Sequence, residues 1–262
     1  MDILKGFYRL LNREFVSWTP FLAILCAGSL IVQLFLLNSA IKGLNEYARH
    51  PRYEDLTVSS GGAAVFLISC GLLCLYFLAT IYSGYWGSKS VYAYLTLPVR
   101  RESLYFSKLS VFLIGLLLLI GVELLTLRIG YFILQRHIET YPNDAERFMM
   151  NNGFYLSAIR SEFVRFLLPL TFSRFMSSVS LFAAVSTGLY YAALCERSRK
   201  FAGLAAVAIA AYLSFEVFVY RLGEVSGYYV SKNLYPSSLL LLALAALFVW
   251  HSLTIMRRGA IA

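Results

Sequence analysis

Long apolar stretches separated by short charged segments dominate the chain. Charge-free runs lie between Glu14 and Lys42 and between Asp55 and Lys89, and four further apolar stretches follow them. A helix of about 20 apolar residues is long enough to cross the hydrocarbon core of a bilayer. We therefore predict six membrane-spanning helices, at residues 21–41, 61–84, 109–134, 166–195, 201–220 and 235–256.

The segment before the first span has the periodicity of an amphipathic helix. Lys5, Arg9 and Arg13 follow one another at intervals of four residues and so share one helix face, while apolar residues line another face. This arrangement is typical of a helix that lies in the membrane surface. We predict such an interfacial helix at residues 4–16.

Residues 141–165 predict a second amphipathic helix, on the outer side of the membrane. Asn143 followed three residues later by Glu146 resembles an N-terminal capping box. The apolar residues that then recur at helical spacing are Leu156, Ile159 and Phe163. Two interpretations stay open for this segment, since it could line or close an exit route, or lie passively among the lipid headgroups.

Composition supports an all-α membrane protein and excludes several other classes. Of the 262 residues, 59% are hydrophobic and only 14% are charged. A soluble globular protein needs more charge at its surface, and a disordered chain has far fewer apolar residues. Six spans account for most of the chain, so we predict a single transmembrane domain over residues 1–262.

The distribution of charge predicts the orientation of the spans. The segments on the side of the two termini carry twelve basic and four acidic residues, and the rest of the chain carries eleven basic and ten acidic residues. Basic loops face the cytoplasm, so both termini of this multi-pass protein are predicted to be cytoplasmic. The formal net charge of +9 is thus explained by topology and by contact with anionic lipids, and we expect no nucleic-acid partner.

The sequence offers little sign of catalysis or metal binding. The cysteines Cys26, Cys70, Cys74 and Cys195 fall within or at the ends of predicted spans, and no histidine or carboxylate joins them at metal-ligand spacing. We expect neither a disulfide nor a metal site. The three histidines form no cluster, and residues 84–90 fail the spacing of a phosphate-binding loop. We therefore predict that the chain is not an enzyme and binds no cofactor of its own.

The most distinctive segment is the cytoplasmic link between spans two and three, residues 88–108. Pro98 cannot lie inside a regular helix, so it should separate the end of span two from a short helical segment that begins near Val99. The apolar and aromatic residues of that segment, Leu104, Tyr105 and Phe106, then face lipid or protein. Its basic residues, Arg100, Arg101 and Lys108, face the cytoplasm.

This link resembles a motif of the ABC-2 type exporter permeases. Leu97, Pro98 and Val99, followed by Arg101, Leu104 and Lys108, look like the Leu-Pro-x-Ser-Arg stretch and later lysine of that family. The motif covers about twenty residues, whereas the likeness in hydropathy covers nearly the whole chain. Two departures are the arginine at position 100, where the family has serine, and a long outer loop between spans three and four instead of five and six.

The resemblance implies a coupling helix in the link, six spans, and an energy supply from a separate protein. The residues implied to contact that protein are Thr96, Leu97, Pro98, Arg100, Arg101, Leu104 and Lys108. The implied partners are two copies of an ABC ATP-binding subunit, which would bind ATP and Mg²⁺, and a second permease copy, in a bacterial plasma membrane. The implied substrate is hydrophobic or amphipathic, with peptides favoured. In the alternative interpretations the link only sets topology, and the chain is a membrane anchor, an assembly factor or a membrane-embedded enzyme.

Five charged residues fall inside or at the ends of the predicted spans. They are Glu123, Arg128, Arg174, Glu216 and Arg221. A charge at the centre of a membrane-spanning helix costs at least about 2.5 kcal/mol, so these side chains should pair or face water and turn away from lipid. We expect a structural network, such as a pair between Arg174 and Glu216. Contact with the substrate is the alternative.

Overall fold

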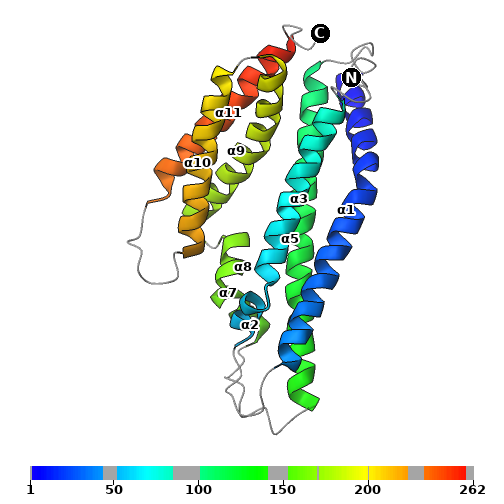
Figure 1. Cartoon of the computed structure of the whole chain (residues 1–262), viewed down its shortest axis with the longest axis vertical. Helices are drawn as coiled ribbons and strands as arrows, with labels where there is room; N and C mark the ends of the chain where they lie inside the picture. Colours follow the sequence, from blue (N-terminus) through cyan, green and yellow to red (C-terminus); the bar gives the residue numbers. More distant parts are fainter. Residues whose placement is uncertain are drawn as a thin grey trace. The chain divides into compact units, whose positions relative to one another are not determined.

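The computed structural model describes residues 2–43, 52–84, 101–140, 153–169, 171–199, 201–223 and 233–257. These residues form nine helices and no strand (Figure 1). The long helices are α1 (Asp2–Lys42), α3 (Gly62–Tyr82), α5 (Arg101–Thr140), α9 (Phe172–Arg197), α10 (Ala202–Gly223) and α11 (Tyr235–Arg257). The short helices are α2 (Tyr53–Ser59), α7 (Phe154–Arg160) and α8 (Glu162–Leu167).

The six long helices correspond one to one with the six predicted spans. Each is long and apolar enough to cross a membrane, because each contains an apolar run that neither a charge cluster nor a glycine pair interrupts. The all-α class and the six candidate spans are therefore confirmed, and the chain is a multi-pass membrane protein by the length and composition of these helices.

The predicted interfacial helix at residues 4–16 is not a separate element. It is the first part of α1, which continues for 41 residues through Pro20. A proline inside a helix removes one backbone hydrogen bond, here the one to the carbonyl of Val16. One missing bond does not end the helix, and Thr19 Oγ1 also donates to the Phe15 carbonyl one turn earlier, at 2.9 Å.

A separate coupling helix is likewise absent from the described residues. Helix α5 begins at Arg101 and runs for 40 residues to Thr140. The predicted link therefore merges with the third span after Arg101, because no glycine or proline lies between Arg101 and Phe112 to stop the helix. The earlier part of the link, with Pro98, lies outside the described residues.

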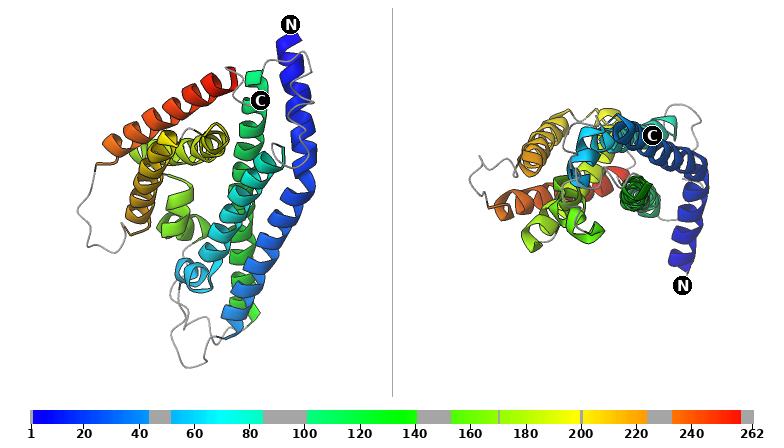
Figure 2. Two further views of the ribbon diagram at one scale, coloured as in Figure 1. Left: turned by 45° about the horizontal axis from the view of Figure 1, so that its top comes forward. Right: turned by 90° about the horizontal axis from the view of Figure 1, so that it is seen from below.

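The described chain divides into two compact units, which we describe separately. Unit 1 comprises Met1–Pro20, Leu73–Gly115 and Pro169–Ala262. Within it α9 lies beside both α10 and α11 (Figures 1 and 2). The rings of Tyr191 and Phe248 stack with their centroids 4.9 Å apart, and the Phe248 ring passes close to Gly188, where a Cβ atom would lie 3.5 Å from it. A small residue at this crossing lets α9 and α11 approach closely.

Unit 2 comprises Phe21–Leu72 and Leu116–Leu168. Its core is an apolar cluster of Leu37, Ile41, Tyr53, Leu56 and Leu134, contributed by α1, α2 and α5. Helix α2 also packs against α7 in this unit. The short helix α2, which was not predicted, thus covers the core between α1 and α5.

The predicted outer helix at residues 141–165 is two short helices where the structure describes it. Helices α7 and α8 are separated by Ser161, whose side chain caps α8 by accepting a hydrogen bond from the Val164 amide at 3.4 Å. The predicted capping box at Asn143 and Glu146 lies outside the described residues. The fourth span begins at Phe172 instead of residue 166, since Thr171 caps α9.

Candidate functional site

Unit 2 contains a buried polar cluster centred on Glu123 of α5. Only 1% of the surface of Glu123 is exposed, and its Oε2 atom accepts a hydrogen bond of 2.6 Å from Nε2 of Gln33 on α1. The same amide nitrogen donates to Ser29 Oγ, one turn earlier on α1, at 3.1 Å. Gln33 and Ser29 are also buried. Hydrogen bonds between polar side chains therefore join α1 to α5 inside this unit.

A small cavity adjoins this cluster. Its volume is about 20 Å³, enough for one water-sized group. Helices α1, α2, α3, α5 and α8 supply its lining, which is polar on the side of Glu123 and half-exposed at the start of α3. The lining residues are Gln33, Leu37, Tyr53, Thr57, Ser60, Gly62, Ala63, Glu123, Thr126, Leu127 and Phe163.

Tyr53, the first residue of α2, positions that helix against α5. Its hydroxyl donates to the Leu127 carbonyl at 2.5 Å, and its ring meets the Tyr131 ring edge to face at 5.4 Å. Burial, and to a smaller degree the charge of Glu123, raise the pKa of the Tyr53 phenol. The hydroxyl therefore keeps its proton and stays a donor well above neutral pH.

The other charged residues of the spans occupy different environments. Arg128 is exposed and places its guanidinium carbon 4.9 Å from the centre of the Phe154 ring, within unit 2. In unit 1, Arg221 is 7% exposed and donates to Ser178 Oγ at 2.7 Å. Glu216 lies on the exposed side of α10. Glu123 and Arg128 therefore belong to unit 2, and Arg174, Glu216 and Arg221 belong to unit 1.

The expected pair between Arg174 and Glu216 stays a prediction. Both residues belong to unit 1, with Arg174 half-buried on α9 and Glu216 on α10. Arg221, on the same helix as Glu216, donates a hydrogen bond to Ser178 on the serine-rich face of α9. Serine at this position therefore offers the arginine a neutral acceptor between the two helices.

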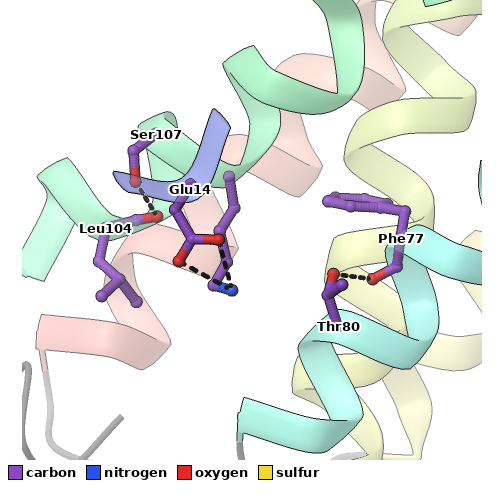
Figure 3. Close-up of polar contacts among 6 residues, drawn as sticks. Glu14, Phe77, Thr80, Leu104 and Ser107 are labelled. Carbon is purple, nitrogen blue, oxygen red and sulfur yellow. Dashed lines mark hydrogen bonds and ion pairs between the residues drawn. The ribbon is translucent and has the colours of Figure 1, made fainter. Parts of the chain in front are cut away.

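A second candidate site is formed by the first turns of α5, in unit 1. Lys108 is 8% exposed, and its Nζ atom lies 3.2 Å and 3.4 Å from the two carboxylate oxygens of Glu14 on α1. Figure 3 shows these two contacts reaching the Glu14 carboxylate, beside Ser107 and Leu104 on α5. This ion pair ties the beginning of α5 to the N-terminal part of α1.

The same turns of α5 contact three further helices of unit 1. Glu102 accepts a hydrogen bond from Arg257 Nε of α11 at 2.7 Å. The Tyr105 ring meets the Tyr190 ring of α9 edge to face at 4.7 Å. Two turns later, Phe112 stacks on Phe77 of α3 with centroids 4.4 Å apart. The start of α5 is therefore attached to α1, α3, α9 and α11.

The structure describes only part of the predicted coupling motif. Thr96, Leu97, Pro98 and Arg100 lie outside the described residues, and Arg101 is described only as the first residue of α5. Leu104 is 7% exposed, so of the two expected environments, lipid or protein, it has protein. Lys108 does not face the solvent as predicted, because it is buried against Glu14.

Gln33 and Tyr53 are among the site residues that were missed in the sequence. Gln33 is a long polar side chain in the middle of a charge-free apolar run, and such a residue is usually hydrogen-bonded inside a membrane protein. This signal could have been read from the sequence, and it predicts that Gln33 faces the interior of the protein. Tyr53 gave no signal, because it lies in a polar segment between two spans and its burial depends on the fold of α2.

Comparisons with known proteins do not identify a family. No protein-family model, no curated protein and no solved structure matches the chain.

Gly130 of α5 tests the packing of unit 2. A Cβ atom at Gly130 would lie 2.6 Å from Leu37 Cδ2 and 2.8 Å from the Tyr53 hydroxyl, whereas nothing lies within 4 Å of one at Gly121 on the same helix. We expect Gly130→Ala to lower the free energy of unfolding by about 1–3 kcal/mol through overpacking. Gly121→Ala should raise it by up to about 1 kcal/mol, because alanine favours helix. Equal stabilities of the two variants in detergent unfolding would contradict the described contact of α1, α2 and α5.

Proposed function

We propose that this chain is the permease subunit of an ATP-driven exporter of the ABC-2 type, in a bacterial plasma membrane with both termini in the cytoplasm. Two copies of an ATP-binding subunit supply the energy, and a second permease copy completes the transport route. The proposal rests on the six apolar helices, on the distribution of basic residues and on the resemblance of residues 96–108 to the coupling motif.

The observation that carries the proposal is the attachment of the first turns of α5. A force applied to the predicted link by an ATPase enters the membrane helices at Arg101, the first residue of α5. From there Glu102, Tyr105 and Lys108 make direct contacts to α11, α9 and α1. Packed side chains and ion pairs move together, so displacement of the link would shift several helices of unit 1 at once.

The surface of the long helices supports a hydrophobic or amphipathic substrate. Large apolar side chains are exposed on all six of them, among them Phe35, Phe132, Phe172, Phe215 and Trp250. An apolar surface of this extent fits lipid, a second permease copy or a substrate route between the copies. Amphipathic peptides combine an apolar face with polar groups and are the substrate class that we favour.

Isolation from the native membrane tests the partner directly. The tagged chain, solubilised in mild detergent, is expected to bring down an ABC-type ATP-binding subunit that mass spectrometry identifies in stoichiometric amounts. ATP hydrolysis by this complex should rise when the transported peptide is added. A chain that is isolated without any ATPase under several mild detergents would contradict the exporter and favour a membrane anchor or assembly factor.

The double substitution Arg100→Ala, Arg101→Ala tests coupling through the link. Arginine makes several directed hydrogen bonds to acidic or carbonyl groups, so loss of both side chains should weaken ATPase binding by roughly tenfold or more. The change is measured as the amount of ATPase retained and as stimulated ATP hydrolysis.

A neighbouring pair of basic residues provides the control. Arg199→Ala, Lys200→Ala removes the same charge from the segment between α9 and α10, on the same predicted side. Enough basic residues remain in both variants to keep the orientation of the spans. If the two double variants retain as much ATPase as the unmodified chain, Arg100 and Arg101 only set topology, and coupling through the link would rest on Pro98 and the aromatic residues alone.

A further inference from the structure

The polar side chains that line the cavity of unit 2 present acceptors. A hydroxyl group has one proton to donate, and the lining hydroxyls already donate theirs to backbone carbonyls. The donated bonds run from Tyr53 to Leu127 at 2.5 Å, from Thr57 to Glu54 at 2.8 Å, from Ser60 to Thr57 at 3.2 Å and from Thr126 to Val122 at 2.8 Å. Only oxygen lone pairs of these groups remain for a ligand.

Gln33 adds a further acceptor. Its amide nitrogen donates hydrogen bonds to Glu123 and Ser29, so its carbonyl oxygen is the atom that can accept a hydrogen bond from a ligand. That oxygen lies toward the start of α3, 3.8 Å from the position that a Cβ atom on Gly62 would take. The first backbone amides of α3, at Gly62 and Ala63, are at the half-exposed rim, where water can satisfy them.

Glu123 brings a carboxyl group to this cavity, and none of the described residues that line the cavity with it is basic. Its Oε2 atom accepts from Gln33, and among the described residues no ion pair reaches Glu123 and no hydrogen bond reaches its Oε1 atom. A carboxylate that is 1% exposed is stable when a cation or several donors surround it. The cavity therefore lacks a cationic donor.

We propose that this cavity binds a primary ammonium group, with Glu123 as the counter-ion and the lining oxygens as hydrogen-bond acceptors. An ammonium group is about the size of a water molecule, which matches the cavity volume of about 20 Å³. Its three N–H donors match a lining of acceptors. The apolar residues Leu37, Leu127 and Phe163 also line the cavity and suit the carbon atom that carries the ammonium group.

The site stands on the geometry of unit 2 alone, whereas its use in transport rests on the proposed export function. In an exporter, the cavity would recognise the amino group of an amphipathic amine or peptide. Binding is measured on the purified chain without an ATPase, so failure of the site and failure of the exporter proposal give different results.

Methylammonium is the probe. We expect it to raise the melting temperature of the purified chain in detergent, with saturation, because a ligand that binds only the folded state stabilises it. Tetramethylammonium has no N–H donor and is too large, so it should have no such effect at the same ionic strength. Equilibrium dialysis with radiolabelled methylamine gives the affinity independently.

Three variants make the test specific. Glu123→Gln removes the charge and should weaken methylammonium binding by roughly tenfold or more, the value of a hydrogen bond to a charged group. Gly62→Ala keeps the carboxylate but adds a methyl group 3.1 Å from the Thr57 carbonyl oxygen, at the rim, and should also weaken binding. Gly71→Ala on the same helix has nothing within 4 Å and should bind as the unmodified chain does.

Several results would overturn the assignment. They are the absence of a methylammonium effect, an equal effect in Glu123→Gln, and an equal effect of tetramethylammonium. Equal stabilisation by sodium or potassium would show an alkali-ion site instead of an amine site. If Glu123→Gln does not fold, the comparison of methylammonium binding between Gly62→Ala and Gly71→Ala decides the assignment, since both variants keep Glu123. Equal binding by these two variants would overturn it.

Discussion

Replacing Lys108 by methionine is expected to lower the free energy of unfolding by about 3–5 kcal/mol, the cost of leaving one partner of a buried ion pair alone. The side chains of Lys108 and Glu14 are only 10% and 12% exposed, and their charged atoms lie 3.2 Å apart. Methionine has a similar length and an apolar stem, so the packing is preserved while the Glu14 carboxylate loses its cation. Unfolding titrations in mixed detergent micelles measure the change.

A double-mutant cycle separates the ion pair from other effects. Adding Glu14→Gln to Lys108→Met removes the unpaired charge and should recover most of the lost stability, because the two residues form one interaction. The exposed pair Arg257 and Glu102, with side chains 67% and 31% exposed, is the matched control. Arg257→Met should cost only about 0–1 kcal/mol. Additive losses at Lys108 and Glu14 would show that they do not interact.

Phe77→Ala is expected to lower the free energy of unfolding by about 3–5 kcal/mol, as for other buried aromatic residues that are cut back to alanine. Phe77 is 0% exposed. Its ring stacks on Phe112 with centroids 4.4 Å apart, lies 6.1 Å from Trp18 and 6.0 Å from Tyr190. One side chain therefore packs against α1, α5 and α9 within unit 1, and its removal leaves a cavity between them.

Phe215→Ala is the control for this loss. Phe215 is 67% exposed on α10, in the same unit, so the same chemical change there removes little packing inside the chain. We expect its effect on stability in detergent to be within about 0.5 kcal/mol. A comparable loss in both variants would mean that Phe77 is not the centre of an aromatic core. Because this core contacts the start of α5, Phe77→Ala should also reduce any stimulated ATP hydrolysis.

Two predicted helix limits were wrong for the same reason. The boundaries expected after residue 16 and between residues 108 and 109 were drawn at changes from amphipathic to apolar pattern. A change in pattern alters which surface a helix faces, but it does not break backbone hydrogen bonds. Helices α1 and α5 therefore continue through both boundaries. The break at Ser161 was not predicted, because a serine cap between two short helices has the same composition as an exposed helical turn.

The sequence alone determined the membrane character of this protein, because the free energy of a span depends on the sum of its apolar residues and not on its neighbours. The six spans and their approximate limits followed from that sum. The tertiary structure decided which polar residues form hydrogen bonds or ion pairs with one another. Gln33 and Glu123 are 90 positions apart, and Glu14 and Lys108 are 94 apart. A buried polar side chain requires some partner, but the identity of that partner depends on how the helices pack.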